Sequence, residues 1–319
     1  MSLFTGMSKK FTLVTTSYKP SWVFNSKVIF LGHWCCNLKE KDVLSEMDYI
    51  IAHPYGMDYR TRKNDYLKVK EIKSKLLPIV AKNLNKIHGV EYSTRSWDIF
   101  FGFWLTRYIS LILNRFSTLE QVFNNNSIDQ VITTHDSSAL IVANSIDFVN
   151  ITNDEYWNHL IFSRILNTSK KFKNVYYQEL PPKSQLVVAK KTIKTMRSLK
   201  RLIYTRFIYN PSSVFFKSSS PFILNSGLPF SLSLALRLRL RINPLKPMSE
   251  FIDMPNCNIE LRQKLDLNSD DECELTKLAY DLFFDLLPIC YLEGFKNISY
   301  AVTKLKWPVK PEFILSLIH

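Results

Sequence analysis

The chain has 319 residues, of which 46% are hydrophobic and 13% aromatic, and its net charge is +14. This length and composition suit two domains, or one large α/β domain with an insertion, and argue against global disorder. The charge favours anionic partners, namely nucleic acid, a phosphorylated substrate or an acidic membrane surface, without choosing among them.

The glycine and cysteine patterns argue against several further kinds of site. Only 7 residues are glycine, and neither GxGxxG nor GxxxxGK[ST] occurs, which argues against a glycine-rich phosphate loop. The 5 cysteines show no CxxC spacing, so we expect reduced thiols in a cytoplasmic protein and no zinc ribbon. No signal peptide and no run of about 18 apolar residues is found, so we expect no membrane span.

Strands and helices are expected to alternate over the first 180 residues. The predicted strands are 11–16, 27–32, 48–54, 130–134 and 173–180, and the predicted helices are 64–88, 94–115 and 153–166. The second and third strands are nearly continuous apolar runs, as in strands buried on both faces. Ser93 and Asn153 are the expected helix N-caps. The alternation predicts an α/β, Rossmann-like fold with a largely parallel sheet and flanking helices.

The last 140 residues have a different character. Residues 190–206 form a basic helical pattern, 236–247 are basic again, and 270–305 predict two helices broken near Pro288. Residues 310–319 predict a strand. The basic helix either docks on anionic lipid or a phosphorylated acceptor, or is a solvated helix face. Aromatic residues are not interleaved with its charges, so we rank nucleic acid lower.

Three predicted strands end in a loop that carries a histidine, namely His33, His53 and His135, the last followed by Asp136. Ligands of open α/β sheets bind beyond the carboxyl ends of the strands, so these side chains converge if the strands are neighbours. A histidine there can act as a base or hold a phosphate; the alternative is a loop histidine bonded to backbone. No HxH or HExxH spacing supports zinc, and we expect no metal or cofactor.

The junction between the two long helices is rich in polar residues. His88 and Gly89 suit a helix C-terminus, and Ser93 suits the start of the next helix. Arg95 in the first turn opposes the helix dipole and needs a partner, either a phosphate or carboxylate ligand or an acid such as Asp98. Trp97 suits core packing, or stacking on a sugar or base. The apolar stripe from Phe100 onward suits the core.

Trp157, Asn158 and His159 are consecutive and so point to different faces of a helix. They cannot form one site together. We expect one of them to lie in the core and one or two to face a cleft or solvent.

The order of the motifs resembles a known family. "LVTTSYKPSW", "KVIFLGHWC", "LNKIHGVEYSTRSWDIFFGFWL", "YWNHLIFSRIL", "CYLEGF" and "LKWPVKPEFIL" follow one another along the chain. This series is similar to a leptospiral-type transferase family of bacterial surface-polysaccharide and O-antigen gene clusters. The similarity is weak over 183–255.

The resemblance implies a glycosyltransferase-like enzyme with two Rossmann-type domains that uses an activated nucleotide-sugar donor and a glycan or lipid-linked acceptor. It assigns no catalytic residue. The positions that match the family are Trp34, His88, Ser93, Arg95, Trp97, Trp157, Asn158, His159 and Glu293. With His135 and Asp136 from the strand ends, these give our substrate-binding candidates.

Two departures from the family pattern matter. The first motif of the family reads Gly-Glu-Trp-Cys, whereas His33 stands at the glutamate position here. The family also continues into a second half with a Gln-His-Gly-Gly motif. We therefore expect a Rossmann-like domain over 1–245, a helical segment over 250–308, and at 309–319 the first strand of a missing donor-binding domain. The chain would then be a truncated acceptor-side half with little turnover alone. The alternative is a non-catalytic basic domain on anionic membrane, at the inner face, or on a partner subunit.

Overall fold

The computed structural model divides the chain into two units. The first comprises Met1–Ser184 and Pro255–Glu293, and the second comprises Gln185–Met254 and Gly294–His319. This grouping differs from the expected boundary at 245, because 255–293 fall in the first unit rather than in a separate helical segment. The structure describes residues 10–36, 40–183, 203–213, 217, 219–245, 252–267, 273–305, 307–308 and 310–316.

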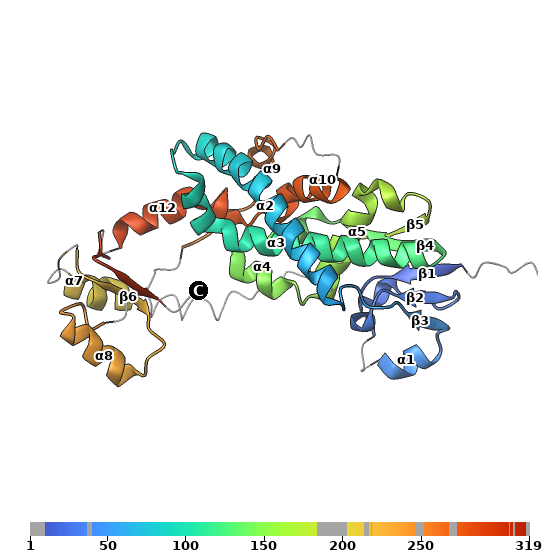
Figure 1. The fold of residues 1–319 in the computed structure, drawn as a ribbon, viewed down its shortest axis with the longest axis horizontal. Coiled ribbons are helices and arrows are strands. Elements are labelled where there is room, and N and C mark those ends of the chain that lie inside the picture. Colours follow the sequence, from blue (N-terminus) through green and yellow to red (C-terminus); the bar gives the residue numbers. More distant parts are fainter. Residues whose placement is uncertain are drawn as a thin grey trace, which may run out of the picture. The chain divides into compact units, whose positions relative to one another are not determined.

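The first unit contains a parallel sheet of five strands in the order β3-β2-β1-β4-β5 (Figure 1). The strands are β1 (Phe11–Val14), β2 (Val28–Phe30), β3 (Tyr49–Ile51), β4 (Ile128–Thr134) and β5 (Tyr176–Leu180). Every pair is parallel, which confirms the predicted α/β, Rossmann-like fold. The chain builds outward from β1 to β3 and then returns to the other side of β1. The topological switch point therefore lies between β1 and β4.

The strand positions follow from the apolar runs. β2 is buried along its whole length, and β1 is buried from its second residue. The run that predicts the first strand continues to Thr16, but β1 ends at Val14. The two threonines after β1 are buried without pairing as strand, and they place the following residues at the switch point.

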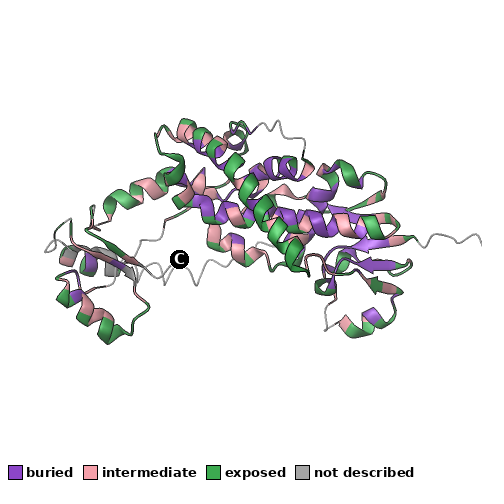
Figure 2. Cartoon of the chain, in the orientation of Figure 1, coloured by how far each residue is buried: buried purple, intermediate pink, exposed green. Residues whose placement is uncertain are grey.

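Two long helices, α2 (Tyr59–His88) and α3 (Thr94–Asn125), form an antiparallel hairpin in the first unit. Ser93 caps α3 as predicted, and its hydroxyl accepts a hydrogen bond from the Ser96 amide at 3.1 Å. α3 is ten residues longer than predicted. Its buried face matches the predicted stripe and lies against the interior (Figure 2). Phe100 is the exception, because its side chain is 52% exposed.

Gly89 ends α2 in the left-handed conformation, with φ at 68°, and its amide donates to the Asn85 carbonyl at 2.9 Å. A Cβ here would meet no atom within 4 Å, so only the backbone conformation opposes a side chain. We expect Gly89→Ala to lower the free energy of unfolding by about 1 kcal/mol, as measured by urea denaturation. Gly89→Asn should lose less, because asparagine tolerates this conformation better. Equal stability of Gly89→Ala and wild type would contradict the prediction.

Shorter helices complete the first unit. They are α1 (Lys41–Ser45), α4 (Ser145–Ile151), α5 (Glu155–Thr168), α9 (Ile259–Arg262), α10 (Glu274–Asp281) and α11 (Phe283–Leu286). The predicted cap of α5 was wrong by one residue: Asp154, not Asn153, accepts from the Trp157 amide at 2.8 Å. α10 packs on α3, where the Tyr108 hydroxyl donates to the Ala279 carbonyl at 2.8 Å.

The second unit contains a two-stranded parallel sheet of β6 (Phe222–Asn225) and β7 (Ile314–Ser316). Its helices are a π-helix (Tyr204–Tyr209), α7 (Asn210–Ser213), α8 (Phe230–Arg239) and α12 (Phe295–Lys304). The guanidinium of Arg237 is buried and donates to the Ile223 carbonyl at 2.7 Å, which ties α8 to β6. The predicted terminal strand thus pairs with an earlier strand of the same unit.

The basic segment Lys190–Arg206 lies mostly outside the described residues, which resume at 203. Its expected contact with anionic membrane therefore stays a prediction. Among the helices that the structure describes, none has the length and apolar character to cross a bilayer.

Candidate functional site

Side chains from three elements gather where β1 and β4 end. Ser17 and Tyr18 follow β1, Asp136 follows β4, and Tyr156 and His159 come from α5. We call these five residues the switch-point cluster. Open parallel sheets bind ligands at this place, because the connections leave the switch point in opposite directions. The sheet order therefore makes the cluster the leading candidate site.

Tyr156 is the centre of the cluster. Its hydroxyl donates to Asp136 Oδ2 at 3.2 Å and accepts from the Lys183 amide at 2.9 Å. Its ring centroid lies 5.0 Å from that of Tyr18. Burial, followed by the Asp136 carboxylate, raises the pKa of Tyr156. The hydroxyl therefore stays protonated at neutral pH and holds Asp136 in place.

His159 is the fully buried member of the cluster. Its Nε2 is 3.1 Å from Thr134 Oγ1, and its ring centroid is 5.3 Å from that of Tyr18. Burial lowers the pKa of His159 to about 4, so the ring is neutral at pH 7. Nδ1 is buried and has no hydrogen-bond partner among the described residues. His159 can position Thr134 and Tyr18, but its ring is out of reach of a ligand.

Trp34 offers an aromatic surface next to the end of β1. Its Nε1 donates to the Thr15 carbonyl at 3.1 Å, and its side chain is 47% exposed. The indole lies directly on Gly32, where a Cβ would come within 2.2 Å of a ring carbon. Any side chain at position 32 would therefore collide with the indole ring in this position.

Only two of the three strand-end histidines follow neighbouring strands, so the condition for their convergence is not met by all three. His33 follows β2 and His53 follows β3, whereas His135 follows β4, on the other side of β1. All three are exposed. The residues that the structure describes include no group of three metal-ligating side chains.

The α2–α3 junction is a helix corner in which Asn85 and His88 bond to other groups of the protein. Trp97 is buried, and its Nε1 donates to Asn85 Oδ1 at 2.8 Å. Asn85, which the sequence reasoning missed, also joins both backbone groups of Tyr92. His88 Nε2 lies 3.1 Å from the Tyr291 carbonyl. Asn85 thus closes the turn with Tyr92 and Trp97, and His88 contacts the segment that contains Tyr291.

Arg95 does not pair with Asp98, because that carboxylate binds Lys73 Nζ at 2.7 Å. Arg95 is exposed and makes no hydrogen bond or ion pair with any described residue. Water screens an exposed charge near a helix end, so the unfavourable dipole needs no ligand to offset it. Figure 1 shows the junction well away from the carboxyl ends of the strands.

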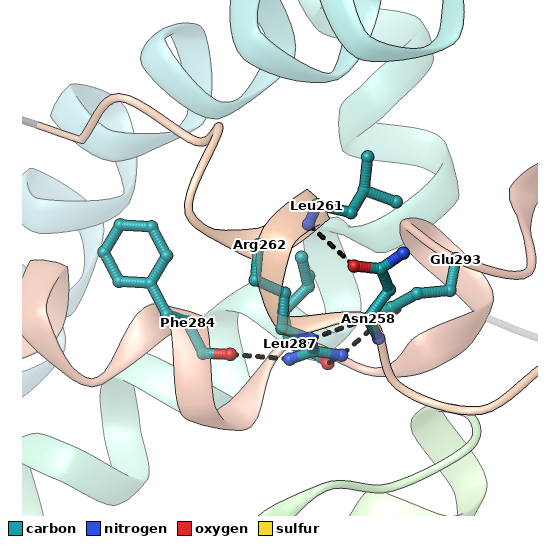
Figure 3. Close-up of polar contacts among 6 residues, drawn as sticks. All are labelled: Asn258, Leu261, Arg262, Phe284, Leu287 and Glu293. Carbon is teal, nitrogen blue, oxygen red and sulfur yellow. Dashed lines mark hydrogen bonds and ion pairs between the residues drawn. The ribbon is translucent and has the colours of Figure 1, made fainter.

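Glu293 forms a buried ion pair with Arg262 (Figure 3). The Arg262 guanidinium donates through Nε to Oε1 at 2.7 Å and through a terminal nitrogen to Oε2 at 3.1 Å. It also donates to the Phe284 and Leu287 carbonyls. The two side chains are 6% and 3% exposed, so this pair fastens α9 to the segment after α11.

Trp157 and Asn158 both serve packing. Trp157 is buried, with its ring centroid 5.8 Å from that of Phe148. Asn158 donates to the Thr152 and Asp154 carbonyls, and its Oδ1 accepts from Arg115 at 3.0 Å.

The structure thus distributes the eleven sequence candidates over three places. Asp136 and His159 belong to the switch-point cluster, and His135 immediately precedes Asp136. Trp34 lies beside β1, and Trp157 and Asn158 are on the same helix as His159. His88, Ser93, Arg95 and Trp97 form the helix corner, and Glu293 forms an ion pair. Tyr18 and Tyr156 were missed as site residues, although both lie within the quoted motifs "LVTTSYKPSW" and "YWNHLIFSRIL".

Comparison with known proteins gives one match. No curated protein and no solved structure matches the chain significantly. The family model described as LIC12162 family transferase matches residues 11–318. Because this match covers nearly the whole sequence, the chain belongs to the LIC12162 transferase family.

Proposed function

We propose that this protein transfers sugar in the assembly of cell-surface polysaccharide or O-antigen, and that its first unit holds the glycan or lipid-linked acceptor. The donor would be an activated nucleotide sugar, and the enzyme would work in the cytoplasm. Membership of a transferase family supports the reaction class. The observation that carries the acceptor role is the gathering of polar side chains and an exposed indole at the switch point.

Trp34 supplies the kind of surface on which a sugar ring stacks. Its exposed face is apolar, and its bond to Thr15 fixes the ring beside β1. Aromatic rings bind ligands with little loss of side-chain entropy when they are held in this way. Trp34 would orient the acceptor sugar over the ends of the strands.

Asp136 is suited to hold the acceptor hydroxyl. Oδ1 accepts from Ser138 at 2.7 Å and from the Ala139 amide at 3.2 Å, and Oδ2 accepts from Tyr156. A carboxylate has about four acceptor positions, so one remains for a ligand. A carboxylate fixed by three bonds keeps its geometry when a sugar hydroxyl arrives.

The binding test uses the full chain and a panel of methyl glycosides of hexoses, N-acetylhexosamines and 6-deoxyhexoses. Saturation-transfer NMR identifies a binder, and titration calorimetry measures its affinity. We expect Trp34→Ala to weaken binding about tenfold, because a stacked ring contributes on the order of 1 kcal/mol. Asp136→Asn should weaken it further.

Phe24→Ala is the matched control. Phe24 is 48% exposed, close to Trp34 in exposure, but it lies in the loop before β2. This variant should bind as wild type does. Failure of every glycoside to bind, or an equal loss in Trp34→Ala and Phe24→Ala, would overturn the acceptor role.

A further inference from the structure

A groove of about 900 Å³ runs along one face of α3 in the first unit. Residues of α2 and α4 complete its walls. A cavity of this size takes a small organic molecule rather than a single ion. Its charged lining residues are Lys73, Asp98, Arg107 and Arg115, and its apolar walls include Phe103 and Phe148.

Arg115 is a cation without an acidic partner in the part of the chain that the structure describes. Its guanidinium donates to Asn114 Oδ1 at 3.1 Å and to Asn158 Oδ1 at 3.0 Å, and both acceptors are neutral amides. Its carbon Cζ lies 5.3 Å from the centroid of the Phe162 ring. Nε is buried and lacks a hydrogen-bond partner among the described residues. A packed, half-buried guanidinium with donors to spare therefore lines the groove.

No described residue near Arg115 neutralises this charge. Cys35 is a titratable group that acts on Arg115, and burial raises the pKa of its thiol to about 12, so it carries no charge at pH 7. Asp98 is the acid of the groove and is already bound to Lys73. Removing a charge from water is costly unless a counter-charge compensates it. The groove thus presents a cation that no described acid compensates.

A second arginine extends the site along the helix. Arg107 is exposed, lies over Phe103 at 4.9 Å, and has no acidic partner among the described residues. It precedes Arg115 by eight positions, which is about 12 Å along the helix axis, on roughly the same face. Arg115 is held in place by its contacts, and the exposed, long side chain of Arg107 can reach the other end of one small anion that carries several oxygens.

We propose that the groove binds a diphosphate ester, with Arg115 as its anchor and Arg107 as a second contact. Arginine suits this ligand because its planar fork meets two phosphate oxygens at once. The two arginines and Lys73 face a single carboxylate, so the lining has a surplus of two positive charges. The proposal rests on the surroundings of Arg115 and does not require that sugar is transferred.

Titration calorimetry of the full chain with inorganic pyrophosphate tests the site. We expect binding that Arg115→Met weakens at least tenfold and that Arg107→Gln weakens severalfold. Arg60→Gln, an exposed arginine at the start of α2, is the matched control and should leave the affinity unchanged. Sodium chloride at equal ionic strength should not compete.

Thermal unfolding without ligand separates binding from a structural role. Arg115→Met should melt no lower than wild type, because the variant removes an uncompensated charge. If it does not fold, Arg107→Gln decides, since an exposed side chain is not needed for folding. Absence of pyrophosphate binding, or unchanged affinity in Arg107→Gln, would then overturn the proposal, as would an equal loss in Arg60→Gln.

Uridine diphosphate and geranyl diphosphate distinguish the source of the ligand. Tighter binding of the nucleotide than of pyrophosphate supports a site for the leaving group of the donor. Tighter binding of the isoprenyl ester supports a site for a lipid-linked acceptor, whose chain would lie on the apolar walls. Glycoside binding is measured separately, so failure of this site leaves the acceptor test unaffected.

Discussion

Replacing Glu293 with glutamine is expected to lower the free energy of unfolding by about 3–5 kcal/mol. The change removes the charge that faces the buried Arg262 guanidinium but keeps the side-chain size. Arg262 is only 5% exposed, so water cannot replace the lost carboxylate. Urea denaturation at pH 7 measures the difference between variant and wild type.

Glu71→Gln is the matched control for this prediction. Glu71 pairs with Lys75 at 2.9 Å on the surface of α2, where the two side chains are largely exposed. Exposed pairs at this spacing contribute about 0.3–0.5 kcal/mol. If Glu293→Gln lowers the free energy of unfolding no more than Glu71→Gln does, the Arg262 charge does not depend on Glu293. Glu293 would then again be a candidate for contact with a ligand.

The second large effect is a loss of stability in mild acid that His159 causes. The unfolded ring has a pKa near 6.5, and the folded ring has a pKa of about 4. Between these values the unfolded state binds a proton that the folded state does not, so stability falls as the pH falls from 6.5 to 4. The difference corresponds to about 3 kcal/mol, and no further loss from His159 is expected below pH 4.

His159→Gln isolates this contribution, because glutamine does not titrate in this range. The stability advantage of wild type over His159→Gln should shrink by about 3 kcal/mol between pH 7 and pH 4, as measured by urea denaturation at each pH. His53→Gln, at an exposed position, should follow wild type throughout. If wild type and His159→Gln lose stability in parallel, His159 is not the group that responds.

The sequence pattern predicted the helices and strands well because burial and capping depend on residues that are close together in the chain. The apolar runs of β2 and the stripe of α3 follow from which faces are buried, and Ser93 caps α3 through an amide three residues away. The prediction that Phe100 is buried was wrong. Its neighbours Trp97 and Phe101 are fully buried, whereas Phe100 lies at the margin of the buried stripe. Periodicity alone does not tell the last residue of a stripe from the first exposed one.

The site was harder to predict because it depends on strand order. The strand-end histidines were expected to converge if their strands were neighbours, but β1 separates β2 from β4. No short sequence motif indicates the order of strands in a sheet. The partner of Glu293 is Arg262, 31 residues earlier, and nothing in the sequence indicates their approach. Arg115 stood at the predicted end of its helix; the structure extends that helix by ten residues and encloses the guanidinium.

The return of residues 255–293 to the first unit affects how the protein folds during its synthesis. Tyr108, His88 and the backbone of Val142 all bond to residues beyond 278. The hairpin of α2 and α3 can form early from contacts that are near in sequence. Its buried face must then wait while the ribosome adds about 150 residues, roughly 8–30 s at typical rates of synthesis. A chaperone that shields α3 during this interval would prevent aggregation of the nascent chain.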